Sequence, residues 1–211
     1  MRLNPISWTR LTKLLADRIE RLDPQDGGAW PRVALDGAPA AAPGRLAGEL
    51  AEELRLRGRA VQRIRADDFL RSASLRLEYG HHDPDAYLDR WLDDGALFRE
   101  VFTPLDPGGS GRVLPDLRDP VTDRSTRSDY RELAPGTVLL LDGARLLGRW
   151  FPFDLTVHLL MSPAALARRT AAEQQWTLPA FARYAAEALP AEAADVVVRV
   201  DDPNHPAWDQ D

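Results

Sequence analysis

The sequence contains no cysteine, which excludes disulfide bonds, thiolate metal sites and cysteine nucleophiles. It also lacks a continuous apolar segment near its start, because residues 1–22 alternate charged and apolar side chains. That stretch is neither a signal peptide nor a membrane span. These two absences favour a cytoplasmic protein that does not bind a membrane.

An excess of positive charge is missing as well. The 211 residues have a formal net charge of −6, whereas general nucleic-acid binding needs a basic surface. The arginines between positions 55 and 65 are interspersed with acidic residues, and they are interpreted mainly as a solvated helix end and strand edge. The hydrophobic fraction of 44% and the length suit one well-buried globular domain.

The first segment predicts an amphipathic helix. Ser7 is a suitable N-cap, and the apolar residues that follow it recur at helical spacing up to Leu22. The turn-rich linker from Asp23 to Pro31 ends this helix. We therefore divide the chain into a helix and linker at 1–30, a domain at 31–206 and a tail at 207–211.

Beyond the linker, strand and helix patterns alternate. Apolar strands are predicted at 32–35, 60–64, 137–141, 153–160 and 194–200, and helices at 45–57, 84–92, 94–102, 163–172 and 178–189. Two or three short strands are expected between Val113 and Tyr130, and a coil at 201–211. Alternation with short connections indicates an α/β protein with a mainly parallel sheet.

Acidic residues and glycines follow three of the predicted strands. These strand ends are Asp36-Gly37, Asp67-Asp68 and Asp142-Gly143. In parallel sheets, ligands bind at the carboxyl edge, and a glycine loop before a helix offers N–H groups to an anion. The three strand ends therefore predict a single binding site.

Six segments, in this order, resemble the uridine kinase family of P-loop kinases, and more narrowly a divergent actinobacterial-type member: VALDGAP, RADDFLR, YGHHDPDAYL, VLLLDGARLL, FDLTVHLLMSPAALARR and ADVVVRVDDP. The resemblance covers most of the chain except the first helix. It implies a single P-loop-type domain, a parallel sheet flanked by helices, with an extra N-terminal helix. It also implies a nucleoside-like small-molecule substrate, and ATP or another nucleoside triphosphate with Mg²⁺ as the phosphoryl donor.

The loop after the first strand departs from the family pattern G-x-x-x-x-G-K-[ST], in which the lysine neutralises phosphate charge and the hydroxyl holds Mg²⁺. Pro43 and Gly44 stand at these two positions, so the cation and the hydroxyl are both missing. The resemblance assigns the nucleotide to this loop and the following lid, through the residues Asp36, Gly37, Ala42, Gly44, Arg45 and Arg168. Arg45 is either a substitute cation or a solvated first-turn arginine.

The acceptor side matches the family better. Asp67 falls where the family places the carboxylate that accepts the proton of the acceptor hydroxyl, although an aspartate capping the next segment is the alternative. The resemblance assigns the substrate to Asp68, Phe69, Tyr79, His82 and Asp85. Phe69 could equally be packing, and Asp83-Pro84-Asp85 could simply begin a helix.

Three further positions that match the family carry charged side chains. Asp142 resembles the family's Glu after the buried strand, so it either holds magnesium through water or caps a helix. Arg168 and Arg169 match the start of the family's lid, and the resemblance makes Arg169 a catalytic cation. Ala172 replaces the next lid arginine.

Two functions are nearly balanced at this point. The first is a uridine-kinase-like phosphotransferase that acts on a nucleoside or similar hydroxyl, and it is named first because the acceptor side is more complete. The second is a catalytically inactive relative that binds a nucleoside, a nucleotide or a protein partner. A third hypothesis is an assembly protein that docks through its first helix.

Overall fold

The structure is a computed structural model that describes residues 3–23 and 27–209. Residues 24–26 of the expected linker and residues 210–211 of the expected tail lie outside the described residues. Within these ranges, no helix has both the length and the apolar character needed to cross a membrane.

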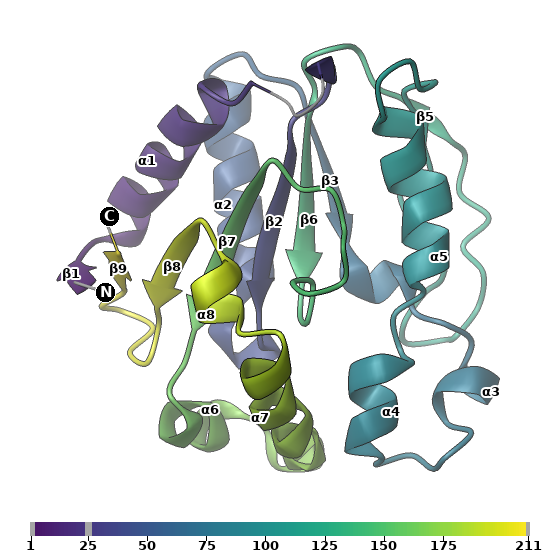
Figure 1. Cartoon of the computed structure of the whole chain (residues 1–211), viewed down its shortest axis with the longest axis vertical. Coiled ribbons are helices and arrows are strands. Elements are labelled where there is room, and N and C mark those ends of the chain that lie inside the picture. The colour runs from purple at the N-terminus through teal and green to yellow at the C-terminus, as the bar shows by residue number, and fades with distance from the viewer. Residues whose placement is uncertain (1–2, 24–26, 210–211) are drawn as a thin grey trace.

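A seven-stranded sheet forms the centre of the molecule, with strand order β1-β9-β8-β7-β2-β6-β3 (Figure 1). Its parallel strands are β2 (Arg32–Gly37), β3 (Val61–Arg65), β6 (Val138–Gly143), β7 (Leu155–Leu160) and β8 (Val196–Arg199). Asp36 lies opposite Gly143 on β6 and His158 on β7, so these strands end at one common edge. The expected α/β fold with a mainly parallel sheet is confirmed.

Helices cover both faces of the sheet (Figure 1). On one face, α1 (Trp8–Glu20) and α2 (Pro43–Leu56) share a core with Val33, Leu35 and Val157. On the other face, α4 (Pro84–Asp89), α5 (Asp94–Leu97) and α7 (Leu178–Glu187) share a core with Leu139 and Leu141. Burial on both faces explains why β2 and β6 are continuous apolar runs.

The N-terminal helix packs as part of this single domain. The Ser7 hydroxyl accepts the Arg10 N–H at 3.3 Å, as expected for an N-cap. Arg57 at the end of α2 donates to Asp17 and Glu20 of α1. The two helices are therefore joined by charge as well as by apolar packing.

The remaining elements are short. They are α3 (Ala73–Arg76), β4 (Arg112–Val113), β5 (Arg131–Glu132), α6 (Pro163–Arg169) and α8 (Pro190–Ala193). The helix expected at 94–102 is α5 followed by a π-helical segment, Phe98–Phe102. The helix expected from Arg45 begins at Pro43, because proline suits the first helical position.

The expected coil at 201–211 is wrong in part. β9 (Ala207–Asp209) pairs antiparallel with β8 and with β1 (Leu3–Pro5), and Trp208 packs partly buried against the α1 side of the core. Strands of three residues are too short to show a period in the sequence. Sheet pairing with distant residues therefore decides their structure.

The strands expected between Val113 and Tyr130 are also wrong. Within that stretch the pairing is one isolated bridge, Arg118 to Ser125, while β4 and β5 pair at its two ends. The Asp119 carboxylate accepts the N–H groups of Val121 and Thr122. Such a local side-chain turn competes with strand pairing.

Candidate functional site

A cleft of about 430 Å³ lies at the carboxyl edge of the sheet, between the ends of β2, β3 and β6. It brings together six of the residues predicted from sequence: Gly37, Ala42, Gly44, Arg45, Asp67 and Asp142. It also contains three residues that the sequence did not single out for this site, namely Arg63, Arg65 and Tyr87. The strand ends therefore meet as the topology requires.

The loop after β2 is closed by its own hydrogen bonds. Pro39–Ala41 form a 3₁₀ turn in which the N–H groups of Ala41 and Ala42 donate to Ala38 and Pro39 at 2.8 and 3.0 Å. Pro39 and Pro43 have no N–H to donate. Most of the N–H groups that a phosphate cradle would supply here are thus paired or missing.

Gly44 lies beneath an ion pair. Arg63 on β3 donates Nε to Asp142 Oδ1 at 2.5 Å and Nη2 to Oδ2 at 3.0 Å, and the Asp142 side chain is only 6% exposed. A Cβ at Gly44 would lie 2.9 Å from Arg63 Nη2 and 3.1 Å from Asp142 Oδ2. Glycine at this position therefore makes room for the pair.

The Arg63 guanidinium is a fixed cation. Its hydrogen bonds to Asp142 raise the pKa of Arg63, which is already far above neutrality. Arg65 lies two residues further along β3 and lines the same cleft, with its Nη1 3.8 Å from Asp68 Oδ1. Alternation along a strand places both arginines on one face.

Arg45 lines the cleft, but its guanidinium is held toward α1. Its guanidinium lies 4.5 Å from the centre of the Trp8 ring, and its Nε donates to Glu49 at 2.9 Å. A cation–π contact and an i,i+4 ion pair both hold it on the outer side of α2. This is the placement expected of a solvated first-turn arginine, one of the two alternatives that the sequence left open.

Asp36 is fully buried below the loop. Its carboxylate accepts the Leu146 N–H at 2.9 Å and the Tyr184 hydroxyl at 3.0 Å, and it contacts His158 Nδ1 at 2.7 Å. Burial and the nearby Asp36 charge raise the pKa of Tyr184. Asp36 thus joins β2, β7, α7 and the loop after β6, and its oxygens face these groups.

The acceptor-side aspartates lie on a 3₁₀ turn, Ala66–Phe69, that follows β3. Asp67 is exposed and lines the cleft, whereas Asp68 is partly buried beside it. Partial burial raises the pKa of Asp68, with Arg65 opposing this effect. Phe69 is fully buried in the core, as expected for the alternative that it serves packing.

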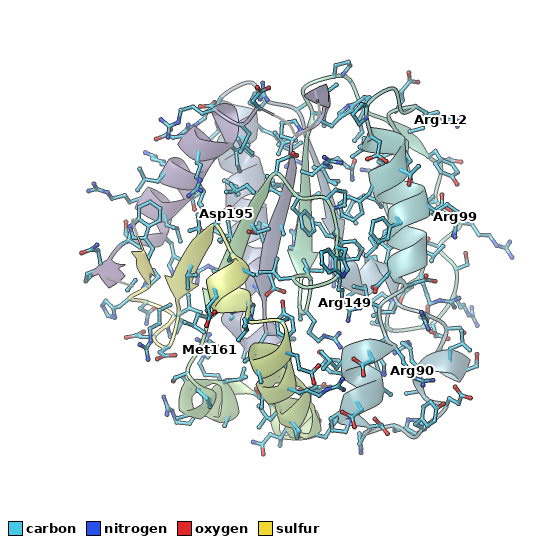
Figure 2. The ribbon with its side chains drawn as sticks, in the orientation of Figure 1. Arg90, Arg99, Arg112, Arg149, Met161 and Asp195 are labelled. Atoms are coloured by element: carbon cyan, nitrogen blue, oxygen red, sulfur yellow. The ribbon has the colours of Figure 1, made fainter. Side chains whose placement is uncertain are left out.

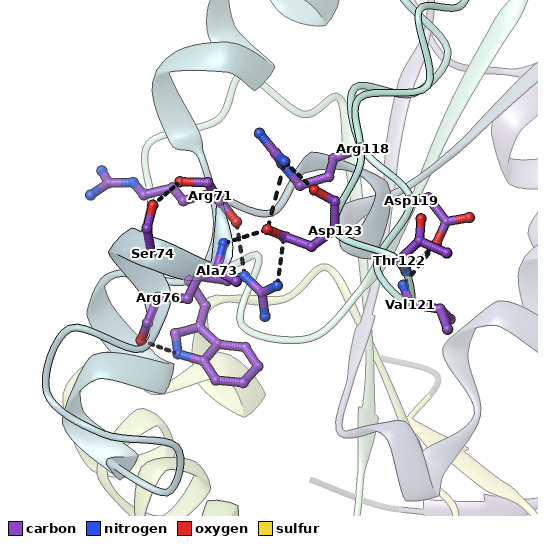
Figure 3. Close-up of polar contacts among 11 residues, drawn as sticks. Arg71, Ala73, Ser74, Arg76, Arg118, Asp119, Val121, Thr122 and Asp123 are labelled. Atoms are coloured by element: carbon purple, nitrogen blue, oxygen red, sulfur yellow. Dashed lines mark hydrogen bonds and ion pairs between the residues drawn. The ribbon is translucent and has the colours of Figure 1, made fainter.

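Hydrogen bonds hold this turn and the following helix α3 against the long loop after β4, and Figure 3 shows those that Asp123 makes with Ala73 and Arg76. The Asp68 carbonyl accepts the N–H groups of Leu117 and Arg118. Asp123 accepts the Ala73 N–H at 2.8 Å and Arg76 Nη2 at 3.0 Å. The segment that carries Asp67 is therefore anchored by backbone and side-chain contacts.

Three of the predicted substrate-binding residues lie elsewhere. Tyr79 is exposed and contacts Arg90, Asp85 pairs with Arg183 at 2.9 Å, and exposed His82 lies against the Trp176 ring. These three side chains do not line the cleft that contains Asp67. Tyr87, two residues after Asp85 in α4, lines it instead.

The two lid arginines differ in placement. Arg168 is exposed at the end of α6, whereas Arg169 Nη1 donates to the Val200 carbonyl at 2.8 Å. Arg169 lines a neighbouring cavity of about 300 Å³ that shares Pro39 and Tyr87 with the cleft. Arg169 is thus near the loop but on its other side.

Mg²⁺ with a nucleoside triphosphate does not fit these residues. Both oxygens of Asp142 are engaged by Arg63, Gly44 has no hydroxyl, and the single lysine of the chain, Lys13, lies in α1. Over residues 3–23 and 27–209, no three His, Cys, Asp or Glu side chains gather as a metal site. The positive charge at the strand ends is instead the guanidinium of Arg63.

Known structures share this fold. A structure described as a possible uridine kinase from Bacillus stearothermophilus has a TM-score of 0.70 at 20% identity, covering 88% of this chain and 96% of its own. A putative fructose transport system kinase from Silicibacter sp. TM1040 has a TM-score of 0.60 at 24% identity, covering 90% of each chain. No protein-family model and no curated protein matches the sequence.

The resemblance read from the motifs is confirmed at the level of the fold. The structural neighbours are uridine kinase-like and related P-loop kinases, and their identities are low. The chain has the α/β fold of these P-loop kinases.

Proposed function

We propose that this protein binds an anionic small molecule of the nucleotide type in the cleft and does not catalyse Mg²⁺-dependent phosphoryl transfer. The observation that carries the proposal is the bidentate Arg63–Asp142 pair above Gly44. A guanidinium carries a permanent charge, and because Asp142 occupies Nε and Nη2 of Arg63, the edge at Nη1 is the part that remains to donate to a phosphate oxygen. Binding would then require no metal.

The class of ligand follows from the neighbours and from the cleft. Two structural neighbours, described as a possible uridine kinase and a putative fructose transport system kinase, point to a nucleoside or a sugar as the uncharged part. Arg63 and Arg65 in the cleft favour a negative group on that molecule. Tyr87 lines the cleft beside them.

A phosphotransferase is the second candidate, and Asp67 favours it. Asp67 is exposed in the same cleft as Arg63, where a carboxylate could accept the proton of a bound hydroxyl. The donor side weakens this candidate, because losing one electrostatic donor slows a reaction by about 10²–10³-fold. Both the lysine and the hydroxyl are replaced here.

Calorimetry and a transfer assay test the proposal together. ADP is titrated in EDTA into the wild type, Arg63→Met and a control, Arg99→Met, which removes one charge from an exposed arginine that pairs with Glu100. We expect binding by the wild type and the control, and affinity lower by about ten-fold in Arg63→Met. ATP with uridine and fructose should give no phosphorylated product.

Two results would contradict the proposal. One is equal ADP affinity in the wild type and Arg63→Met. The other is phosphoryl transfer that requires Mg²⁺ and disappears in Asp67→Asn, which would establish the phosphotransferase.

A further inference from the structure

A separate cavity of about 130 Å³ lies between the end of β7, α7 and α8, where Figure 2 labels Met161. Its described lining residues all differ from those of the cleft that contains Arg63 and Asp67. Most of its wall is apolar, with side chains that include Leu160, Leu166 and Phe181. An engineered apolar cavity of about 150 Å³ takes up a benzene molecule. The size of this cavity therefore suits one aromatic ring.

His158 is a polar side chain in this apolar wall. It is 6% exposed and lies on the α7 face of the sheet, because its neighbours Val157 and Leu159 face the core shared with α1 and α2. Its Nδ1 contacts Asp36 at 2.7 Å. The other ring nitrogen, Nε2, has no hydrogen-bond partner among the residues that the structure describes, and a small molecule can still reach it.

The contacts of Asp36 fix where the His158 ring carries its hydrogen. The Asp36 carboxylate accepts the Leu146 N–H and the Tyr184 hydroxyl, and because a carboxylate only accepts, His158 Nδ1 is the donor of their contact. In the uncharged ring, Nε2 is then an acceptor. The Tyr184 hydroxyl already accepts the Leu147 N–H at 3.1 Å. The inner wall therefore presents Nε2 to an O–H or N–H donor.

A structural role alone leaves this nitrogen unexplained. A polar atom without a partner in an apolar place opposes folding, and Asp36 already has Tyr184 and Leu146 as partners without His158. A water molecule suits the cavity poorly, because a buried water needs about two to four polar partners and the wall is mainly apolar. A ring with one hydroxyl satisfies the nitrogen and fills the apolar space at once.

The mouth of the cavity bears on the charge of the occupant. Leu189, just before α8, is 46% exposed there, and a ligand would remove part of this apolar surface from water. The Glu192 carboxylate at the exposed rim and the Asp36 carboxylate behind His158 both repel an anion. These features favour an uncharged ligand.

We propose that this cavity binds a small uncharged molecule of the phenol type, and that His158 Nε2 accepts the hydrogen bond of its hydroxyl. Phe181 and Tyr184 line the cavity, and aromatic rings pack favourably on one another. The inference is independent of the proposed function, because the cavity and the cleft have different lining residues.

The test compares phenol with toluene, which carries a methyl group in place of the hydroxyl, and with benzoate. Each is titrated by calorimetry into the wild type. A hydroxyl that enters an apolar cavity without an acceptor loses about ten-fold or more in affinity, so such a cavity prefers toluene. With His158 as the acceptor, phenol should bind at least as tightly as toluene. Benzoate should bind at least about ten-fold more weakly than phenol, because its charge is repelled and desolvated.

Two tryptophan variants of α7 locate the site. Ala185 lines the cavity, whereas its neighbour Ala186 is equally exposed and is not a lining residue. Ala185→Trp should block the cavity and weaken phenol binding about ten-fold or more, and Ala186→Trp should leave it within about two-fold. Both variants keep the Asp36–His158 contact, so both should unfold at a Tm close to that of the wild type.

Nitrogen NMR of the imidazole rings observes His158 directly. Phenol should shift the His158 Nε2 resonance clearly more than toluene does, because only phenol donates a hydrogen bond. Four results would overturn the inference: no binding of phenol, binding of toluene about ten-fold more tightly than phenol, phenol binding that Ala185→Trp leaves unchanged, and phenol binding that leaves Nε2 unshifted.

Discussion

The two sides of the cleft differ in whether their polar groups have partners within the protein. On the β2 side, the N–H groups of Ala41 and Ala42 are paired within the loop, and Arg45 is held by Trp8 and Glu49. On the acceptor side, Asp67 is exposed in the cleft with no hydrogen bond or ion pair to the described residues, and Arg65 is exposed beside it. One side is satisfied by its own contacts, and the other has groups for a ligand to satisfy.

The proposed function accounts for this difference: the fold would keep a binding site while the groups of its donor side are closed off. A phosphate cradle binds an anion because its N–H groups and its cation have no partner within the protein. Once those groups pair internally, the loop gains stability and loses affinity. At the strand ends, the Arg63–Asp142 pair occupies both oxygens of the Asp142 carboxylate and constrains Gly44.

The largest effect is expected below the loop. Asp36→Ala removes the shared acceptor of the Leu146 N–H and the Tyr184 hydroxyl, and should cost about 3–5 kcal/mol because the buried partners stay unpaired. Thermal unfolding should show a fall in Tm of roughly 10 °C. Asp201→Ala, at a more exposed carboxylate, is the control and should lower Tm much less. An equal fall in Tm for the two variants would contradict the larger contribution that is assigned here to the buried Asp36 hydrogen bonds.

The second largest loss of stability is expected on the acceptor side of the cleft. Gly143→Ala places a Cβ 2.5 Å from Ala66 Cβ, so the turn that carries Asp67 must move away from β6. Overpacking of this kind costs about 1–3 kcal/mol. Gly48→Ala is the matched control on α2, where the new Cβ has only an ordinary contact and the helix should gain stability. Urea unfolding measures both, and a Gly143→Ala variant as stable as the wild type would contradict the close packing.

A double-mutant cycle on Arg63 and Asp142 sharpens the comparison at the strand ends. Asp142→Asn and Arg63→Met should each lower stability, with a coupling free energy of about 1 kcal/mol, since the pair is partly exposed at Arg63. Chemical unfolding of the four proteins measures this coupling. Additive losses would mean that the pair does not form in solution.

The smallest effect is a pH-dependent gain at Asp68. Because burial raises the pKa of Asp68, its ionised form destabilises the fold, and the penalty appears as pH rises through that pKa. Asp68→Asn should therefore raise Tm by about 1–2 °C at neutral pH and give no gain below about pH 3. At Asp119, whose pKa is lowered by the Thr122 and Val121 N–H groups, the change to Asn should instead lower Tm at neutral pH. The same sign at both positions would contradict this assignment.

Much of the fold could be predicted from sequence because its signals are local. The spacing of apolar residues predicts the long helices and the parallel strands. The N-cap Ser7 and the glycine turns mark where these elements begin or end. β1 and β9 could not be predicted, since three residues show no period and their pairing joins the two ends of the chain. The loop after β4 was misjudged because Asp119 turns it locally.

The residues of the candidate site also divide into those that the sequence predicts and those that it does not. Gly37, Asp67 and Asp142 meet because parallel strands end at one edge, and sequence order was enough to predict that. The direction of Arg63 was not predictable, because its partner Asp142 lies 79 residues away. Its alternation with Arg65 along one strand was the available signal.

The central claim is that Arg63 takes the place of a metal-held donor site, and the metal dependence of nucleotide binding tests it most directly. ADP is titrated into the wild-type protein by calorimetry, once with Mg²⁺ and once with EDTA. The Kd should agree within about two-fold, because the cation that meets the phosphates is part of the chain. Binding that is tighter by about ten-fold or more with Mg²⁺ would contradict the account.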